Sequence, residues 1–270
     1  MLLLPLPGVF QPPSDAWMVV RRIHDERLAE GMSALDLCTG SGVLAIAAAQ
    51  AGCGNVTAID VSRRAVMAVR LNAALNRVRI RALRGDLFAP VSGERFDLIV
   101  SNPPYLPSPQ DELPRRGLAR AWEAGHDGRA ILDRICAEAH EHLHPGGVML
   151  LVHSELCGEQ ATLRALQSCG LHAEVVFRHQ GKFGPIMRAR TEWLHERGLL
   201  NHPGQQSEEM LVIKAERPIR PPSLHAASLQ EPSRLRSCSL PCSPPLRLSF
   251  WARLKKSARS ESPSRSASWM

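Results

Sequence analysis

The stretch Ser33-Ala34-Leu35-Asp36-Leu37-Cys38-Thr39-Gly40-Ser41-Gly42 decides the fold. Its first six residues predict a short strand, and its glycines predict a tight turn that opens a helix over 43–51. Glycines at such a turn let the backbone approach a ligand, and the N-terminus of the following helix adds favourable dipoles. A strand, a glycine turn and a helix in this order predict an α/β fold with a ligand site at the turn.

The same alternation continues along the chain. Strands are predicted at 33–38, 56–60, 80–83, 96–101, 148–153, 171–177 and 209–215. Helices are predicted at 16–30, 43–51, 62–72, 129–143 and 158–168, with an amphipathic segment at 185–198. Strands that alternate with helices predict a mostly parallel sheet with right-handed crossovers.

Composition separates the folded part from a terminal segment. Residues 1–216 carry a net charge of −1, whereas residues 217–270 carry +8. The terminal segment holds 13 Ser and 8 Pro in 54 residues without a hydrophobic period, so we expect a disordered tail. A nearly neutral folded part argues against a protein whose whole surface binds nucleic acid.

The seven cysteines are scattered, form no CxxC pair and show no zinc-type spacing with histidine, so we expect no metal site. Scattered cysteines suit the reducing cytosol, and we expect a cytoplasmic protein. The apolar start lacks a basic segment, and no run approaches 18 apolar residues. We therefore expect neither a signal peptide nor a membrane span.

Aspartates lie at the ends of three successive predicted strands: Asp36, Asp60 and Asp86. A carboxylate after the second strand can accept hydrogen bonds from both ribose hydroxyls, and one after the third can accept from an adenine amino group. Each aspartate alone is equally well explained as a strand end or helix cap, but three together indicate a nucleoside cofactor. Because Gly40-x-Gly42-x-x-Ala45 also fits a dinucleotide fingerprint, NAD is an alternative at this point.

The tetrapeptide Asn102-Pro103-Pro104-Tyr105 follows the predicted strand 96–101. Ligands of open α/β sheets bind at the carboxyl ends of strands, and two prolines stiffen the chain there. This corner can present the Asn102 side chain and the Pro103 carbonyl as two acceptors for one planar NH2 group, with Tyr105 as a flat apolar wall. The alternative interpretation is a proline-rich turn with an Asx cap.

Asp36 and the corner formed by Asn102–Tyr105 together indicate which cofactor binds. A carboxylate just before the glycine turn repels a pyrophosphate but can hold a cationic amino or sulfonium group. A corner that binds an NH2 group fits methylation of an amide or an exocyclic amine. These residues favour S-adenosylmethionine (SAM) over NAD.

On these residues the chain resembles the class I SAM-dependent methyltransferases, and within them the HemK/PrmC-type protein-(glutamine-N5) methyltransferases. The resemblance covers residues 8–216. The family's Asp-x-x-x-Gly-x-Gly turn corresponds to Asp36–Gly42, and its ribose-binding acid corresponds to Asp60. Its adenine-contacting segment corresponds to Gly85-Asp86-Leu87-Phe88, and its acceptor motif corresponds to Asn102–Tyr105. Gly125-His126-Asp127-Gly128 resembles its Gly-Gly-x-Asp-Gly segment, with His126 where glycine is usual. Pro12-Pro13-Ser14-Asp15 resembles its N-terminal Pro-x-x-Asp segment beside the cofactor.

The resemblance implies a Rossmann-like, doubly wound, seven-stranded and mostly parallel sheet with the last strand antiparallel, in a catalytic domain over 1–216. It implies that the acceptor amide is held by Asn102, Pro103, Pro104 and Tyr105. It implies SAM contacts from Asp36, Thr39, Gly40, Gly42, Asp60, Asp86, Leu87 and Asn102.

The implied reaction is methyl transfer to the side-chain amide nitrogen of a protein glutamine, as on a translation release factor. Only 32 residues precede the first predicted strand, whereas the bacterial release-factor enzymes carry an N-terminal helical docking domain. The chain thus resembles the short, single-domain branch, some members of which act with a partner subunit. The stretch 183–188 either shapes the substrate cleft or forms a surface helix with an apolar face.

One alternative is an N6-adenine methyltransferase acting on DNA or RNA, with Tyr105 stacking on the base. The basic tail is the feature that favours it, and nucleic acid is the less favoured acceptor. A non-enzymatic binding module is a second alternative, but its motif would be expected to decay, and the motif here is intact. An NAD-linked oxidoreductase is a third, and no hydride-transfer residues support it.

Overall fold

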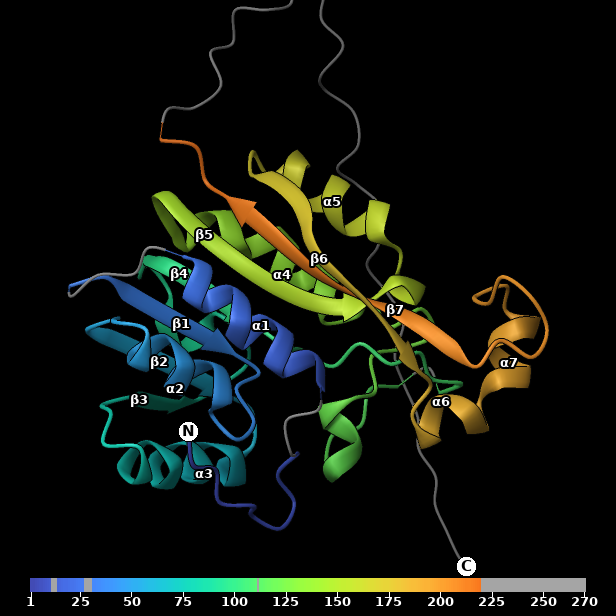
Figure 1. Cartoon of the computed structure of the whole chain (residues 1–270), viewed down its shortest axis with the longest axis horizontal. Coiled ribbons are helices and arrows are strands. Elements are labelled where there is room, and N and C mark those ends of the chain that lie inside the picture. The colour runs from blue at the N-terminus through green and yellow to red at the C-terminus, as the bar shows by residue number, and fades with distance from the viewer. Residues whose placement is uncertain (11–13, 27–30, 111, 220–270) are drawn as a thin grey trace, which may run out of the picture. The chain divides into compact units, whose positions relative to one another are not determined.

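The computed structural model of the protein describes residues 1–10, 14–26, 31–110 and 112–219. Within these ranges, seven strands form a sheet in the order β3-β2-β1-β4-β5-β7-β6 (Figure 1). The strands are β1 (Ser33–Leu37), β2 (Asn55–Asp60), β3 (Arg81–Arg84), β4 (Phe96–Ser101), β5 (Leu143–Ser154), β6 (His172–Lys182) and β7 (Ser207–Glu216). The predicted disordered tail lies, from residue 220 onward, outside the described residues.

The pairing of the strands confirms the predicted fold class. β1 pairs in parallel with β2 and β4, β2 with β3, and β4 with β5. The last strand, β7, runs antiparallel between β5 and β6. The sheet is therefore seven-stranded and mostly parallel, with one antiparallel strand, as in the class I methyltransferase fold.

Helices cover both faces of the sheet, which is why the central strands are apolar on both sides. The α-helices are α1 (Ser14–Asp25), α2 (Val43–Gln50), α3 (Arg63–Leu75), α4 (Leu132–Glu138), α5 (Glu159–Ser168), α6 (Pro185–Ala189) and α7 (Thr191–Glu196). α1, α2 and α3 lie over one face and α4 and α5 over the other (Figure 1). Successive residues of β4 alternate between the two cores: Leu98 and Val100 pack on the first side and Ile99 on the second.

Several element boundaries differ from the sequence prediction, among them the end of β6, which runs to Lys182 instead of residue 177. The predicted helix over 129–143 is shorter, since α4 ends at Glu138, a short 3-10 turn follows, and β5 begins at Leu143. The segment Pro145-Gly146-Gly147, which precedes the predicted strand 148–153, lies inside β5 as an irregularity, where the register with β4 jumps from Leu143 to Val148. A Cβ on Gly147 would lie 2.9 Å from the carbonyl oxygen of His144 and from that of Phe96. Glycine is therefore needed where the irregular part of β5 packs against β4.

The predicted helix over 16–30 corresponds to α1, which ends at Asp25, and residues 27–30 lie outside the described residues. The amphipathic segment 185–198 forms α6 and α7, between β6 and β7. No helix of the described residues is both long enough and apolar enough to span a bilayer.

Candidate active site

A pocket of about 810 Å³ lies at the carboxyl ends of β1, β2, β3 and β4, where ligands of open α/β sheets bind. Its volume falls within the range of about 300–1,000 Å³ that is usual for small-molecule sites. Six of the predicted site residues line it: Gly40, Asp60, Asp86, Leu87, Asn102 and Pro104. The structure thus brings together six predicted residues from four separate strand ends, and their roles stay predictions.

Asp36 organises the turn after β1. Its Oδ2 accepts hydrogen bonds from Thr39 Oγ1 at 2.5 Å and from the backbone N–H of Ala45 at 3.0 Å. Its Oδ1 has no hydrogen-bond partner among the described residues. Asp36 and Thr39 are buried and are not among the residues that line the pocket. In the structure both hold the turn in shape, and their contact with SAM stays a prediction.

Burial raises the pKa of Asp36 to about 7, against the lowering effect of hydrogen bonds from Thr39 and Ala45; the nearby Asp60 carboxylate raises it further. A cationic group near Oδ1 would stabilise the ionised form and satisfy the unpartnered oxygen.

The two predicted glycines of the turn have different tasks. Gly40 has a φ of 54° and lines the pocket. Gly42 has a φ of 87° and faces α3, where a Cβ would lie 3.2 Å from Val69 Cγ2. Both positions need glycine for their left-handed backbone. Gly42 serves the packing of α2 on α3, and it is Gly40 that opens the backbone to a ligand.

Asp60 at the end of β2 is oriented by the backbone. Its Oδ2 accepts from the N–H of Gly40 at 3.0 Å, and its Oδ1 accepts from the N–H of Ser62 at 2.8 Å. Burial nevertheless raises the pKa of Asp60, while these two hydrogen bonds lower it. Each carboxylate oxygen keeps a further lone pair, so a fixed pair of acceptors lies in the pocket wall.

The end of β3 contains a carboxylate that is already occupied. Asp86 forms a two-pronged ion pair with Arg134 of α4, with N–O distances of 3.2 and 2.7 Å. The neighbouring Leu87 has a φ of 44°, and Cys38 after β1 has a φ of 56°. Such values are uncommon for residues with a side chain, and they cluster at functional sites. Sequence reasoning did not select Cys38, because nothing in the residue type signals its backbone conformation.

The corner Asn102–Tyr105 is divided between the pocket and the interior. Asn102 and Pro104 line the pocket, whereas Pro103 and Tyr105 are not among its lining residues. The Tyr105 hydroxyl donates to Asp15 Oδ2 on α1. The Tyr105 carbonyl oxygen accepts from Cys157 Sγ at 3.1 Å. The structure thus anchors Tyr105 by both ends of the residue, and its role toward an acceptor stays a prediction.

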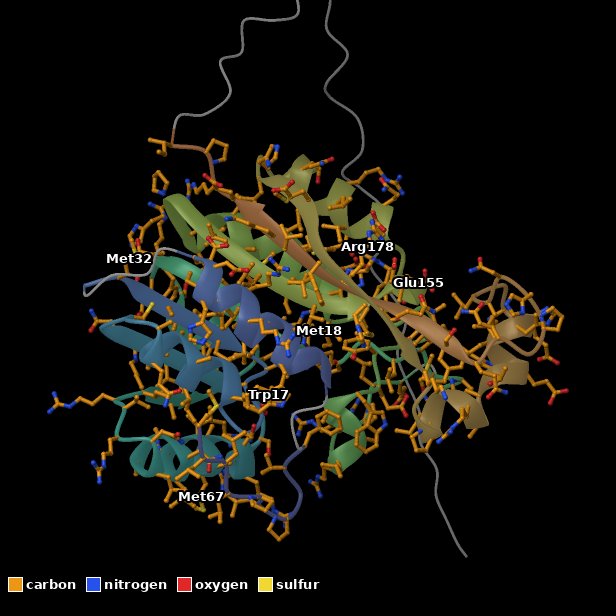
Figure 2. The ribbon with its side chains drawn as sticks, in the orientation of Figure 1. Trp17, Met18, Met32, Met67, Glu155 and Arg178 are labelled. Carbon is orange, nitrogen blue, oxygen red and sulfur yellow. The ribbon has the colours of Figure 1, made fainter. Side chains whose placement is uncertain are left out.

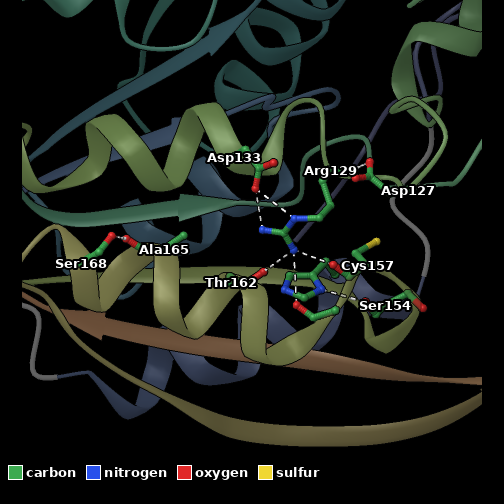
Figure 3. A network of polar contacts seen from close by, with 10 residues as sticks. Asp127, Arg129, Asp133, Ser154, Cys157, Thr162, Ala165 and Ser168 are labelled. Carbon is green, nitrogen blue, oxygen red and sulfur yellow. Dashed lines mark hydrogen bonds and ion pairs between the residues drawn. The ribbon is translucent and has the colours of Figure 1, made fainter. Parts of the chain in front are cut away.

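Arg129 connects the segments behind this corner (Figure 3). Its guanidinium donates to the carbonyl oxygen of Cys157 at 2.5 Å and to Thr162 Oγ1 at 3.0 Å, and it pairs with Asp133 at 2.6 Å. The network joins the start of α4 to the start of α5. Gly128 lies just before it, with a φ of 72°, and a Cβ there would be 2.3 Å from the Tyr105 carbonyl oxygen. The Gly125–Gly128 segment therefore packs directly against the corner.

The loop after the corner is closed at its base by backbone pairing. The N–H of Leu106 donates to the Trp122 carbonyl at 2.8 Å, and that of Ala124 donates to the Leu106 carbonyl at 3.1 Å. Arg190, between α6 and α7, forms an ion pair with Glu123 and donates to the Pro107 carbonyl at 2.7 Å. Glu123 lines the pocket. Arg129, Arg190 and Glu123 were not found from the sequence, because their partners are distant in the chain.

The stretch 183–188 does not present an apolar face to solvent. Phe183 and Met187 are buried in a small cluster of apolar side chains with Leu156, Leu194 and Leu200. None of 183–206 is among the residues that line the pocket. This segment contacts the loop after β4 through Arg190 and Leu106 instead.

Comparison with known proteins shows the family of the chain. The family described as "Methyltransferase small domain" matches residues 16–114. A putative protein N5-glutamine methyltransferase of Methanocaldococcus jannaschii is 35% identical over 181 residues, which are 67% of this chain and 90% of the relative. A release factor glutamine methyltransferase of Deinococcus radiodurans is 39% identical over 170 residues, which are 60% of each chain.

A solved structure has the same fold. The chain resembles one chain in the structure of the E. cuniculi Mtq2–Trm112 complex, which is responsible for the methylation of the eRF1 translation termination factor, with a TM-score of 0.53 and 20% identity. The match covers 78% of this chain and 99% of that one.

The fold is that of a class I SAM-dependent methyltransferase, the class to which the matching family model and the relatives belong. The backbone opening at Gly40, the acceptor pair of Asp60 and the unpartnered oxygen of Asp36 fit a cofactor with a ribose and a cationic end. The chain belongs to the HemK/PrmC-type family of protein-(glutamine-N5) methyltransferases.

Proposed function

We propose that this protein transfers a methyl group from SAM to the side-chain amide nitrogen of a glutamine in a protein. The observation that carries the proposal is that Asn102 and Pro104 line the same pocket as Gly40 and Asp60. The acceptor corner and the predicted cofactor turn therefore open into one space. When bound, SAM supplies an electrophilic methyl group on a sulfonium sulfur.

The corner residues are proposed to orient a poor nucleophile. The lone pair of an amide nitrogen is delocalised into its carbonyl group. Asn102 Oδ1 and the Pro103 carbonyl oxygen would each accept one N–H of the acceptor, which directs the nitrogen and stabilises positive charge that develops on it. Fixing both reactants in one pocket supplies much of the remaining acceleration. No general base is required at the start, because the proton can leave after transfer.

Eight residues are proposed to bind the cofactor or to shape its site: Asp36, Thr39, Gly40, Gly42, Asp60, Asp86, Leu87 and Asn102. Gly40, Asp60, Leu87 and Asn102 would contact it from the pocket wall, supported by their positions there. Thr39 and Gly42 would act by shaping the turn, and Asp36 would do so through Oδ2 while its unpartnered Oδ1 takes the cationic end of the cofactor. Asp86 would act together with Arg134, with which it pairs.

The acceptor is proposed to be a translation protein, such as a release factor, because relatives carry the names release factor glutamine methyltransferase and ribosomal protein uL3 glutamine methyltransferase. A partner subunit is part of this proposal, since the Mtq2 neighbour is a complex with Trm112. On this chain, one side of α3 carries three exposed apolar side chains: Met67, Leu71 and Leu75. Figure 2 labels Met67 on this helix. Purified chain that is monomeric and fully active would exclude an obligatory partner.

Residues 1–216 are proposed as the catalytic domain and the cytoplasm as its location. The seven strands of the sheet end at Glu216, which supports that boundary. The five described cysteines are all free thiols, as suits a reducing compartment.

The test is incubation of the protein with methyl-labelled SAM and a panel of release factors, glutamine peptides and oligonucleotides. We expect label on a glutamine side chain of a protein or peptide. Asn102→Ala should lose transfer by at least about 100-fold and keep SAM binding. Asn201→Ala, an exposed asparagine on the loop before β7, is the matched control and should leave transfer unchanged. Full turnover by Asn102→Ala would refute the mechanism.

A second candidate function is N6-adenine methylation of nucleic acid. The observation that favours it is that six arginines are among the residues that line the pocket: Arg63, Arg64, Arg84, Arg116, Arg120 and Arg134. Guanidinium groups bind phosphates. Label on an oligonucleotide adenine, with none on glutamine, would establish this alternative in the same assay.

A further inference from the structure

We propose that Asn72 of α3 is a positioning residue for the cofactor site, because its side chain ties the N-terminal segment 1–10 to the glycine turn after β1. This inference rests on the proposed function, since it requires that SAM binds in the pocket at that turn. The sequence resemblance begins at residue 8, whereas the contacts of Asn72 reach upstream of it, to Leu4.

The side chain of Asn72 is fully buried and has a partner at each end of its amide. Its Oδ1 accepts from the backbone N–H of Leu4 at 2.8 Å, and its Nδ2 donates to the carbonyl oxygen of Ser41 at 2.8 Å. A backbone N–H can only donate and a carbonyl can only accept, so these two partners fix the direction of the amide. One side chain thus joins two segments that lie 68 and 31 positions before it.

Asn76, at the end of α3, holds the same segment at a second point. Its Oδ1 accepts from the N–H of Leu2 at 2.8 Å, and its Nδ2 donates to the Leu2 carbonyl oxygen at 2.6 Å. Four helical residues advance by about 6 Å and two extended residues by about 6.6 Å. Because these lengths match, the two asparagines can bond to alternate residues of the segment. The N-terminus accordingly lies beside α3 (Figure 1).

The other end of the segment forms part of the pocket wall. Gly8, Val9 and Phe10 line the pocket, as does Arg64 in the first turn of α3. Gly8 has a φ of 77°, and a Cβ there would collide with Nη1 of Arg64, so the segment packs closely on that turn. The ring of Phe10 lies 5.8 Å from the ring of Trp122, between centroids, on the loop after β4. The segment therefore reaches from the end of α3 to the pocket.

Asn72 also fixes one peptide group of the glycine turn. The N–H of Gly42 donates to the Thr39 carbonyl oxygen at 2.9 Å, and the carbonyl of the same peptide, on Ser41, accepts from Asn72. Both ends of this peptide are therefore held. Gly40, which opens the backbone to the pocket, directly precedes it. The carboxylates of the turn bond to nearby residues, and Asn72 adds the link to a distant one.

These contacts couple the segment to the cofactor. While Leu4 is bonded to Asn72, the amide is held in the direction that supports the Ser41 carbonyl, and residues 8–10 complete the wall. If SAM binds this docked form more tightly, SAM shifts the population toward it. By reciprocity, docking of the segment must raise the affinity for SAM by the same factor.

Leu4→Pro tests the link from outside the pocket, because it removes the N–H that Asn72 accepts, and Leu4 is not among the lining residues. We expect the Kd for SAM to rise about 5- to 20-fold. The KM for SAM should rise with it, while kcat changes by less than about twofold. Leu4→Ala keeps the N–H and should bind SAM at least about threefold more tightly than Leu4→Pro. Isothermal titration calorimetry and steady-state kinetics of the full chain measure these values.

Hydrogen–deuterium exchange measures the docking itself. In the parent protein, SAM should slow exchange of the backbone amides of residues 1–10 by at least about threefold. In Asn72→Ala this protection should be lost, and the Kd for SAM should rise. The double variant Leu4→Pro/Asn72→Ala should bind SAM at most about twofold more weakly than Asn72→Ala, because both changes break one link. Asn55→Ala, an exposed asparagine at the start of β2, is the matched control and should change neither quantity.

Two results would overturn the proposal: equal Kd values for Leu4→Pro and Leu4→Ala, or exchange of residues 1–10 that SAM does not alter in the parent protein. A merely structural Asn72 would give both of these results. If Asn72→Ala does not fold, the two Leu4 variants and the exchange of the parent protein decide. If the parent protein binds no SAM, the proposed function has failed instead, so the two failures are distinguishable.

Discussion

The turn after β1 and the corner after β4 face one pocket but are held in different ways. Asp36 bonds to residues three and nine positions away, and Asp60 to residues two and 20 positions away. At the corner, Tyr105 bonds to residues 90 and 52 positions away. The loop that follows bonds to Arg190, which lies 83 positions from Pro107. The first region is nearly self-contained, whereas the second depends on the rest of the domain.

This difference predicts which property a mutation in each region should change. A change in the turn after β1 should weaken cofactor binding and leave the fold intact. A change in the contacts behind the corner should disturb stability and the acceptor site together, while the cofactor turn keeps its own hydrogen bonds.

Gly128→Ala is expected to have the largest effect, and it acts on the corner. The added Cβ would meet the Tyr105 carbonyl oxygen and Cys157 Sγ, at a backbone φ of 72°. Crowding together with the left-handed backbone should lower the free energy of unfolding by roughly 2–5 kcal/mol. Gly93→Ala is the matched control, with a φ of 80° and nothing within 4 Å of the Cβ, so only roughly 1–2 kcal/mol is expected. Urea unfolding of both variants measures the contrast, and equal losses would contradict the contact behind Tyr105.

Arg129→Met should have the next largest effect. The Cys157 carbonyl and Thr162 hydroxyl would lose a charged donor inside the domain, so we expect a loss of about 2–3 kcal/mol in the free energy of unfolding. Arg178→Met is the control. Arg178 pairs with Glu159 and Glu209 at the surface, where such pairs contribute at most about 1 kcal/mol (Figure 2). A loss for Arg129→Met no larger than for Arg178→Met would show that the network is dispensable.

Much of the first region could be predicted from the sequence, and the reason is physical. Asp36, Gly40 and Asp60 act through neighbours in the chain, so residue type and spacing carried the information. The corner itself was visible, because Pro103 and Pro104 restrict the backbone locally. Its supports were not, since Arg190 meets Glu123 only after the strands between them have assembled. The backbone strain at Cys38 likewise appears only with coordinates.

Asp60→Ala tests the self-contained region. We expect SAM affinity to fall about 10- to 100-fold, equivalent to about 1.4–2.7 kcal/mol. Asp86→Ala should cost less, because that carboxylate is occupied by Arg134 at the surface. Isothermal titration calorimetry of both variants checks the order. A larger effect at Asp86 than at Asp60 would mean that the third strand end, and not the second, fixes the cofactor.

The pH dependence of stability gives the smallest expected effect. The pKa of Asp36 is about 7 in the folded state, above the ordinary aspartate value of 3.8, so between these values the folded state binds more protons than the unfolded state. Its contribution to stability is therefore present at low pH and lost as pH rises toward 7. Between pH 6 and pH 8 the loss should be about 1 kcal/mol. Asp36→Asn should remove this component, so urea unfolding at both pH values should show a difference between parent and variant that changes with pH. If the free energy of unfolding differs between parent and variant by the same amount at both pH values, the raised pKa of the buried Asp36 carboxyl group is contradicted.

The account's central claim is that Asn102 presents its oxygen to an acceptor amide in the same pocket that holds the cofactor. The most direct measurement is a crystal structure of the protein with S-adenosylhomocysteine and a glutamine peptide. We predict that the glutamine amide nitrogen lies within hydrogen-bond distance of Asn102 Oδ1 and of the Pro103 carbonyl oxygen. A peptide amide bound away from this corner, or an Asn102 amide with its nitrogen toward the peptide, would contradict the claim.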